Sequence, residues 1–268
     1  MNKPYFNNDS AILYLGDCLK VLNKIEDKSV DVIFADPPYF LSSGGVSCHS
    51  GKQVSVDKAD WDKSITIKEK NKFNKKRLKE CRRVLKDNGT IWISGTFHNI
   101  YSIGVVLEET GFSIINNITW EKPNPAPNLA CRCFTNSTET ILWARKQLTQ
   151  KKKGKHFFNY SLMKEINGNK QMKDVWIINL PKKEEKEYGK HPTQKPVDLL
   201  IRILLASTKE NDLVLDPFCG SSTTGVACKM LNRRYIGIDN EKEYLDLSIK
   251  RLIWYKAKEA NCNNEKKF

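Results

Sequence analysis

The sequence predicts an α/β fold of the Rossmann-like, doubly wound kind, with a mixed sheet, in a single domain over residues 1–268. Two observations support this prediction. Apolar runs such as VDVIFA at 30–35 are continuous rather than alternating, as in strands buried on both faces of a sheet. Such runs alternate along the chain with segments whose apolar residues recur at helical spacing. With 40% hydrophobic residues, the chain can bury a core large enough for this fold.

The chain begins with a strand and a helix. AILYLGD at 11–17 predicts the strand, and CLKVLNKI predicts the helix because Leu19, Leu22 and Ile25 share one face. After the strand VDVIFAD, residues 41–62 are rich in Gly, Ser and Lys and predict a mobile loop.

A basic amphipathic helix is predicted next, over residues 67–85. Leu78 and Cys81 lie on its apolar face, and lysines and arginines occupy most of the remainder. Gly89 is expected to end this helix as its C′ residue. The elements that follow alternate in the same way: strands at 90–95, 112–122 and 137–146, with a helix at 100–111.

The middle of the chain interrupts this alternation. KPNPAPNLACRCFTN contains too much proline for regular structure. Between Arg145 and Lys195 there are 14 Lys or Arg against 5 Asp or Glu. Because an irregular connection of this length is unusual inside a compact domain, residues 125–190 are expected to be an inserted functional module. The net charge of the whole chain, +14, favours a polyanionic partner, most simply nucleic acid.

Strand and helix signals return towards the C-terminus. KPVDLLIRILLAS predicts a helix with Pro196 in its first turn. The remaining elements are a strand at 212–218, a turn and helix at 219–232, a strand at 233–240 and a closing helix at 242–258, before a frayed end. We find no signal peptide and no apolar run of membrane-spanning length, so a cytoplasmic protein is expected. The eight cysteines form no Cys-x-x-Cys pair, and no metal site is expected.

Two predicted strands are followed by motifs that are typical of functional sites. The first stops at Asp36 with two prolines and Tyr39. The second delivers Asp216 into a turn of small residues, where backbone N–H groups can approach a ligand closely. Asp239 follows 23 residues later, near the spacing at which an acid meets ribose hydroxyls. Taken alone, the second strand end with its turn and Asp239 would also suit a nicotinamide-dependent dehydrogenase, although the full G-x-G-x-x-G motif is missing.

Together the two strand ends resemble the amino-methylating DNA methyltransferases that use S-adenosylmethionine. DPPY at 36–39 matches the catalytic motif of this family, and DPFCGSSTTG at 216–225 matches its cofactor loop. HPTQKP at 191–196 matches the motif before the adjacent helix, and LGDCLKVL resembles the segment that meets the adenine of the cofactor. Because the catalytic motif precedes the cofactor loop, the chain is similar to the β group, whose fold is circularly permuted.

The resemblance implies a role for each residue of the catalytic motif. The Asp36 side chain and the Pro37 carbonyl would accept hydrogen bonds from the exocyclic amine of the target base and free its lone pair. Pro38 would hold that carbonyl in extended geometry. Tyr39 would stack on the base once it is flipped out of the helix.

The resemblance also implies an S-adenosylmethionine site. Its methionine part would lie against Phe218, Gly220 and Ser221, and its ribose against Asp239. The other cofactor contacts would be Asp17 at the adenine amine, Thr193 and Lys195 at the amino-acid end, and Asp216 at the start of the loop. Ser222 stands where the family usually has glycine, and a positive φ there would cost about 1 kcal/mol.

DNA is the expected partner. Residues 125–190 are expected to be the inserted target-recognition region. Phosphate contacts are predicted for the basic helix and for the residues Lys151, Lys152, Lys153 and Lys155. Asp before Pro-Pro-Tyr favours adenine N6 over cytosine N4. The chain is most similar to the second methyltransferases of DpnII-type restriction systems, which implies GATC as target, tolerance of single-stranded DNA and a possible homodimer. Cytosine-N4 or RNA methylation, and a non-catalytic nucleic-acid-binding protein, remain the alternatives.

Overall fold

The structure, a computed structural model, describes residues 3–40, 46–49, 52–55, 65–129, 131–149, 151 and 154–254. Its main sheet is built from β1 (Phe6–Asn7), β2 (Ala11–Leu15), β3 (Val30–Ala35), β6 (Leu85–Gly95), β7 (Phe112–Glu121), β8 (Thr138–Lys146), β9 (Val175–Ile177), β10 (Leu213–Asp216) and β11 (Arg234–Asp239). The strands lie in the order β1-β2-β11-β10-β3-β6-β8-β7-β9. From β2 to β6 they run parallel, whereas β8 is antiparallel to both of its neighbours. The predicted mixed sheet is therefore confirmed.

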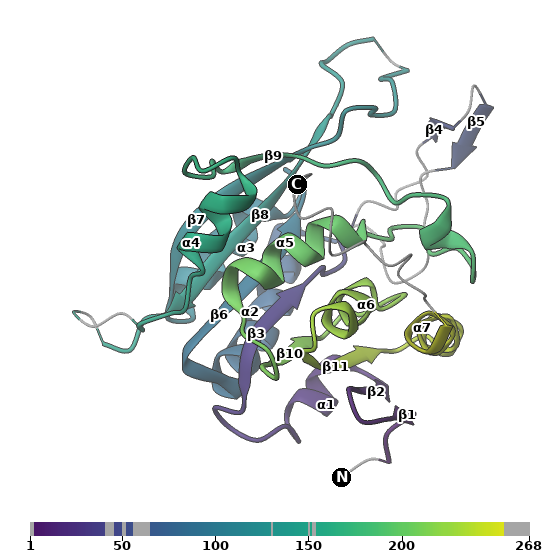
Figure 1. The fold of residues 1–268 in the computed structure, drawn as a ribbon. Coiled ribbons are helices and arrows are strands. Elements are labelled where there is room, and N and C mark those ends of the chain that lie inside the picture. The colour runs from purple at the N-terminus through teal and green to yellow at the C-terminus, as the bar shows by residue number, and fades with distance from the viewer. Residues whose placement is uncertain are drawn as a thin grey trace.

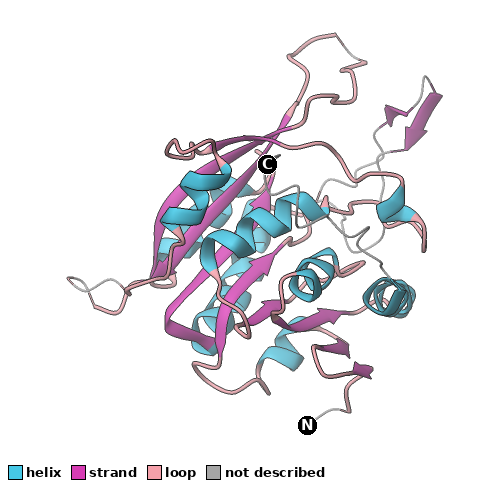
Figure 2. Cartoon of the chain, viewed as in Figure 1, coloured by secondary structure: helices cyan, strands magenta, loops and turns pink. Residues whose placement is uncertain are grey.

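Helices cover both faces of the sheet (Figures 1 and 2). One face carries α1 (Cys18–Leu22), α2 (Ile67–Val84) and α3 (Ile100–Glu109), and the other carries α4 (Tyr160–Ile166), α5 (Val197–Ser207), α6 (Thr223–Met230) and α7 (Lys242–Trp254). Strand β3 joins the two cores, because successive side chains point to opposite faces. Val32 and Phe34 pack into the core under α5 and α6, while Ile33 and Ala35 pack into the core under α2 and α3. This double burial is the reason for the continuous apolar run.

Strands β3 and β10 are neighbours although their ends, Asp36 and Asp216, lie 180 residues apart in the sequence. The register pairs Val214 with Val32 and Leu215 with Ile33. Because the two strands are parallel, their carboxyl ends emerge together at one edge of the sheet. We call this edge, at which β3, β6, β10 and β11 end, the carboxyl edge. In doubly wound sheets this is the usual place for a ligand.

Helix α2 ends earlier than the sequence predicts. Leu85, its C-cap, is already extended and pairs with Val30, and the next pair is Val32 with Thr90. Gly89 therefore lies inside β6, in an irregular stretch, and is not a helix C′ residue. A Cβ at this position would lie 2.7 Å from the backbone oxygen of Asp31, so the glycine is needed for close contact between two strands.

Two predicted irregular regions contain strands. Within 41–62, β4 (Val46–His49) and β5 (Lys52–Ser55) form an antiparallel pair, and the rest of that range lies outside the described residues. Within 125–190, β8 is an interior strand of the main sheet and β9 pairs with β7. The range is therefore not one insertion. The segments 122–137 and 178–195, which overlap the two ends of this range, leave the sheet at the carboxyl edge. The second of them contains a short 3-10 turn, η2 (Glu184–Lys186). Among the described helices, none combines the length and apolar character needed to cross a membrane.

Candidate active site

The Asp36 carboxylate is held by a buried tyrosine. The Tyr39 hydroxyl donates to Asp36 Oδ1 at 2.7 Å and lies 3.1 Å from Ser94 Oγ and 3.2 Å from Glu139 Oε2. Burial, together with the charges of Asp36 and Glu139, raises the pKa of Tyr39 well above its ordinary value. The phenol therefore stays protonated and acts as a donor that fixes the orientation of the carboxylate.

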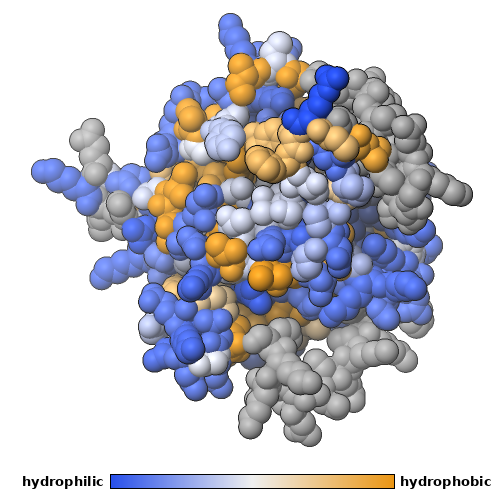
Figure 3. Space-filling view, turned by 90° about the horizontal axis from the view of Figure 1, so that it is seen from above, coloured by the Kyte–Doolittle hydropathy of each residue, from blue (hydrophilic) through white to orange (hydrophobic). Residues whose placement is uncertain are grey.

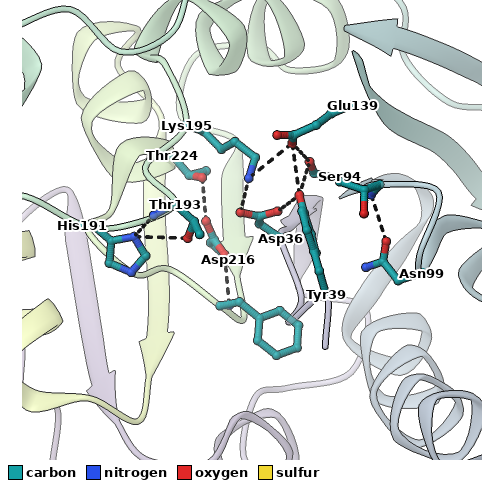
Figure 4. A network of polar contacts seen from close by, with 12 residues as sticks. Asp36, Tyr39, Ser94, Asn99, Glu139, His191, Thr193, Lys195, Asp216 and Thr224 are labelled. Carbon is teal, nitrogen blue, oxygen red and sulfur yellow. Dashed lines mark hydrogen bonds and ion pairs between the residues drawn. The ribbon is translucent and has the colours of Figure 1, made fainter. Parts of the chain in front are cut away.

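A buried lysine holds the second oxygen of Asp36 (Figure 4). Lys195 Nζ lies 2.5 Å from Asp36 Oδ2 and 3.6 Å from Glu139 Oε2, and the lysine side chain is 7% exposed. Burial works to lower the pKa of Lys195, but the two carboxylates outweigh it and raise this pKa above the ordinary value. Lys195 is therefore a charged ammonium whose first partner is Asp36.

Glu139, at the start of β8, completes this cluster. Its Oε1 lies 2.9 Å from Lys122 Nζ. Burial alone would raise the pKa of Glu139, but Lys195 and Lys122 lower it to about 2. Two carboxylates and two ammonium groups therefore neutralise one another at the carboxyl edge.

Asp216 fixes the turn that follows β10. Its Oδ1 accepts from the Phe218 amide at 3.0 Å, and its Oδ2 accepts from Thr224 Oγ1 at 2.6 Å. Because Asp216 is buried, its pKa is raised to about 7 in spite of these two hydrogen bonds. The side chain ties the end of the strand to the first turn of α6.

Gly220 brings the next part of the turn against neighbouring groups. Its φ is +48°, and a Cβ here would lie 2.9 Å from His191 Nε2. Its amide donates to Asp239 Oδ2 at 2.8 Å, and its carbonyl accepts from Ser248 Oγ at 2.8 Å. Burial raises the pKa of Asp239 despite the backbone N–H groups that it accepts. The turn is therefore fastened to both β11 and α7.

A buried arginine supports the same turn from α7. Arg251 Nη1 donates to Ser221 O at 2.6 Å, to Ser221 Oγ at 2.9 Å and to Thr223 Oγ1 at 3.0 Å. Between these residues, Ser222 has a φ of +52°, in the left-handed region. Because φ is positive, serine is strained at this position, as the sequence predicts for a positive φ.

Asp17 lies at the start of α1, and both of its carboxylate oxygens already accept hydrogen bonds. Its Oδ1 accepts from the Leu19 and Lys20 amides at 3.0 and 3.2 Å, which caps the helix. Its Oδ2 accepts from Arg77 Nη2 at 3.2 Å, and the Arg77 guanidinium lies 3.5 Å from the centroid of the Phe73 ring. A ligand at Asp17 would therefore share this carboxylate with Arg77.

One pocket at the carboxyl edge brings these residues together. Its lining includes every residue predicted for the cofactor and two residues of the catalytic motif: Asp17, Thr193, Lys195, Asp216, Phe218, Gly220, Ser221, Asp239, Asp36 and Pro38. Pro37 lines a smaller cavity beside it, together with Leu78 and Ile93. Tyr39 is 7% exposed and is joined to the pocket wall by its hydrogen bond to Asp36 and by the Lys195 ammonium over its ring.

Two of the lysines predicted to bind DNA, Lys151 and Lys155, are among the described residues, and neither lines this pocket. Strand β8 runs antiparallel to β6, so the residues after Lys146 emerge at the edge opposite Asp36. Lys151 and Lys155 are exposed on this segment, and the Gly154 amide donates to the carbonyl of Lys146. Lys152 and Lys153 lie outside the described residues. The phosphate contacts predicted for Lys151 and Lys155 would therefore lie at the edge opposite the catalytic motif.

Several residues of the site could not be found in the sequence. Glu139 and Ser94 come from strands β8 and β6, and each reads locally as an ordinary polar residue at the end of a strand. Arg251 reads as part of the solvated face of α7, yet it is fully buried. Only the pairing of distant strands and helices places these side chains beside Lys195, Tyr39 and Ser221.

Residues 30–250 match the family model described as DNA methylase, for N6 and N4 methyltransferases. The chain belongs to this DNA methylase family. It is 62% identical to the Type II methyltransferases M2.LlaDCHI of Lactococcus lactis subsp. cremoris and M2.DpnII of Streptococcus pneumoniae, over 94% of this chain and 93% of each relative. It is 52% identical to M2.MboI of Moraxella bovis, over 93% of this chain and 90% of that protein.

Solved methyltransferase structures share the fold. The crystal structure of the M1.HpyAVI–SAM complex matches with a TM-score of 0.67 and 31% identity, covering 91% of this chain and 99% of that one. The cytosine-N4-specific PvuII DNA methyltransferase matches in fold with a TM-score of 0.75 at 19% identity, covering 98% and 93%. This methyltransferase therefore has the S-adenosylmethionine-dependent fold that the sequence predicts, and it is an enzyme of the Type II class.

The pocket suits S-adenosylmethionine, the cofactor of this methyltransferase. The Asp239 carboxylate is an acceptor for ribose hydroxyls, and Lys195 is a cation that a ligand carboxylate can reach. The rings of Phe73 and Phe218 stack with centroids 6.3 Å apart and both line the pocket, offering apolar contact. Gly220, which has no Cβ, allows the His191 ring to pack closely against this turn, and both residues line the pocket. The donor set therefore matches the chemistry of the cofactor.

Proposed function

We propose that this chain methylates adenine N6 in DNA, at GATC and in single-stranded as well as duplex substrates, as part of a cytoplasmic restriction–modification system. The observation that carries the proposal is the Asp36 carboxylate, which follows β3 at the wall of the cofactor pocket. The similarity to the second methyltransferases of DpnII-type systems supports the target sequence.

Asp36 and Pro37 act on the target amine. The lone pair of an exocyclic amine is delocalised into the base, so the nitrogen is a poor nucleophile. Two acceptors, the Asp36 carboxylate and the Pro37 carbonyl, would bind its two hydrogens and draw the nitrogen towards tetrahedral geometry. Pro38 restricts Pro37 to extended backbone, which fixes that carbonyl before the base arrives.

Tyr39 has a less direct role than the family resemblance implies. Its ring is buried, and Lys195 Nζ lies 5.3 Å from the ring centroid. We expect an incoming base to displace the lysine from this ring before it stacks on Tyr39. Until then, the tyrosine serves to orient Asp36 through its hydroxyl.

The cofactor supplies a methyl group on a positively charged sulfur, which transfers in line to a nitrogen nucleophile. We assign its ribose to Asp239, its adenine to Asp17, and its amino-acid end to Thr193 and Lys195. Phe218, Gly220 and Ser221 would surround the methionine part. Asp216 would keep this turn in shape.

The DNA is proposed to lie across the carboxyl edge. Segments 122–137 and 178–195 leave the sheet there, and they carry the exposed cations Arg132, Lys183, Lys186 and Lys190. These segments replace the continuous range 125–190 as the proposed target-recognition region. Pairing into a homodimer stays a prediction, which sedimentation at several protein concentrations would test.

Cytosine N4 is the second candidate target, because the fold is shared with the cytosine-N4-specific PvuII enzyme. Labelled methyl groups should be transferred to single- and double-stranded oligonucleotides of defined sequence, and the products digested to nucleosides. We expect N6-methyladenine from strands with GATC. N4-methylcytosine would overturn the choice of base, and no transfer from the wild-type protein would favour a non-catalytic DNA-binding protein.

Asp36→Ala tests the proposed mechanism. We expect methyl transfer to fall by about 100-fold or more, since an acceptor for the target amine is lost. Binding of S-adenosylhomocysteine, measured by calorimetry, should change by less than about threefold in the same variant. Undiminished transfer by Asp36→Ala would refute the role of the carboxylate.

A further inference from the structure

The partners of Glu139 suggest a purpose for this buried carboxylate. Its side chain is 13% exposed. Its Oε1 is held by Lys122 Nζ at 2.9 Å, and its Oε2 faces the Tyr39 hydroxyl at 3.2 Å and Lys195 Nζ at 3.6 Å. A carboxylate in such a place is costly unless it is paired. The Oε2 atom is therefore aimed at the groups that contact Asp36.

The ammonium of Lys195 competes with the proposed reaction. It binds Asp36 Oδ2 at 2.5 Å while the Tyr39 hydroxyl occupies Oδ1 at 2.7 Å. A target amine is also a donor, so it meets an oxygen that already carries an ammonium. A carboxylate oxygen can accept more than one hydrogen bond, but an ammonium at 2.5 Å crowds Oδ2, so we expect the amine to displace Lys195 from this atom.

We propose that Glu139 is a positioning residue that takes over the Lys195 ammonium when the target amine displaces it from Asp36. The inference rests on the proposed adenine-N6 transfer. A buried ammonium released without a partner would be strongly unfavourable. Glu139 lies close enough for Lys195 to change partners without leaving the pocket wall.

The electrostatics of the cluster suit this exchange. Glu139 is ionised throughout the neutral pH range, since its pKa is about 2. Lys122 fixes Oε1, which leaves Oε2 directed at Lys195. The cluster contains two acids and two lysines before and after the shift, so no net charge enters or leaves the buried site.

Glu139→Gln removes the charge and keeps the shape. We expect kcat for DNA methylation to fall about tenfold or more, with the KM for S-adenosylmethionine changed by less than about threefold. Glu121→Gln is the matched control, because Glu121 pairs with Thr138 across the strands at the same edge of the sheet. It removes the same charge and should behave as wild type. Thermal unfolding of each variant separates a loss of rate from a loss of stability.

A double-mutant cycle with Lys195→Gln tests whether Glu139 acts through this lysine. In the Lys195→Gln background, Glu139→Gln should lower kcat by less than about twofold further. Additive losses, or wild-type kcat in the Glu139→Gln single variant, would overturn the inference. If Glu139→Gln does not fold, Glu139→Asp keeps the charge but shortens the reach, and its smaller loss should vanish in the same background. A wild-type protein that transfers no methyl group would instead refute the proposed function.

Discussion

Ser222 combines a strained backbone with complete burial. Its φ of +52° lies in the left-handed region, where a Cβ is unfavourable, and the residue is 0% exposed. The Tyr235 hydroxyl donates to Ser222 Oγ only at 3.4 Å, which is a weak contact. The loop therefore carries backbone strain that its side chain compensates poorly.

Ser222→Gly should relieve this strain. We expect the free energy of unfolding to rise by about 1 kcal/mol, measured by urea denaturation. Asn232→Gly is a suitable control, because Asn232 has a φ of +57° and asparagine tolerates this conformation. The free energy of unfolding should rise less for Asn232→Gly than for Ser222→Gly. A Ser222→Gly protein less stable than wild type would show that the hydroxyl outweighs the strain.

Asp216 predicts how stability depends on pH. Its pKa is about 7 in the folded protein, against 3.8 for an ordinary aspartate. The folded state therefore binds the proton more tightly than the unfolded state. The stabilisation that protonated Asp216 gives to the folded state is fully present below about pH 4. It is lost as the pH rises through 7.

Asp216→Asn removes this titration. The melting temperature of the wild-type protein without ligand should fall relative to that of Asp216→Asn between pH 5 and 8, a range set by the raised pKa. Differential scanning calorimetry at four pH values measures the difference. A constant offset between the two proteins across this range would contradict the raised pKa.

At the scale of elements, the start of α5 fixes the segment that carries Lys195. Glu185 is 3% exposed and accepts from the Val197 amide at 2.9 Å and the Lys182 amide at 3.1 Å. Gln194 Nε2 donates to the carbonyl of the same residue at 3.0 Å. A single buried side chain thus joins η2 to the first turn of α5. The position of Lys195 at Asp36 depends on this anchor.

Glu185→Gln should loosen this segment. An amide offers one acceptor oxygen where the carboxylate offers two, so one backbone N–H loses its partner. We expect a loss of about 1–3 kcal/mol in the free energy of unfolding and weaker binding of S-adenosylhomocysteine. Glu184→Gln, an exposed neighbour in the same 3-10 turn, should change neither. Equal effects in the two variants would contradict the anchoring role.

At the scale of the whole molecule, the net charge is +14, and much of it falls between residues 145 and 195. Hydrophilic residues surround the face seen from above, with apolar areas between them (Figure 3). Electrostatic attraction to DNA falls steeply as salt rises, because binding releases counterions. Which lysines contribute depends on the edge of the sheet at which they lie.

Two charge-matched pairs test this dependence. Lys183→Gln with Lys186→Gln removes two charges at the carboxyl edge, and Lys151→Gln with Lys155→Gln removes two at the opposite edge. We expect the first pair to weaken binding of a short duplex and to reduce the slope of log K against log salt by about 1–2. The second pair should leave both unchanged. The reverse result would restore the DNA contact that the sequence predicts for Lys151 and Lys155.

Local patterns determined the fold class, most elements and the pocket-lining residues. Continuous apolar runs identify strands such as β3, since burial on both faces leaves no room for polar residues. The motifs around Asp36 and Asp216 are contiguous, so their residues can be recognised without a structure. Strand direction along a parallel sheet then brings the two motifs to one edge.

Only the tertiary structure decided the partners of these residues. The bonds from Lys195 to Asp36 and from Lys122 to Glu139 join strands and loops that no local pattern relates. The position of Lys151 and Lys155 has the same cause. Charge is visible in the sequence, but the antiparallel direction of β8, set by its pairing with β6 and β7, decides which edge of the sheet carries it. Functional residues that lie in short contiguous motifs can be predicted from the sequence. Contacts across the sheet depend on the pairing of distant segments, which only the tertiary structure shows.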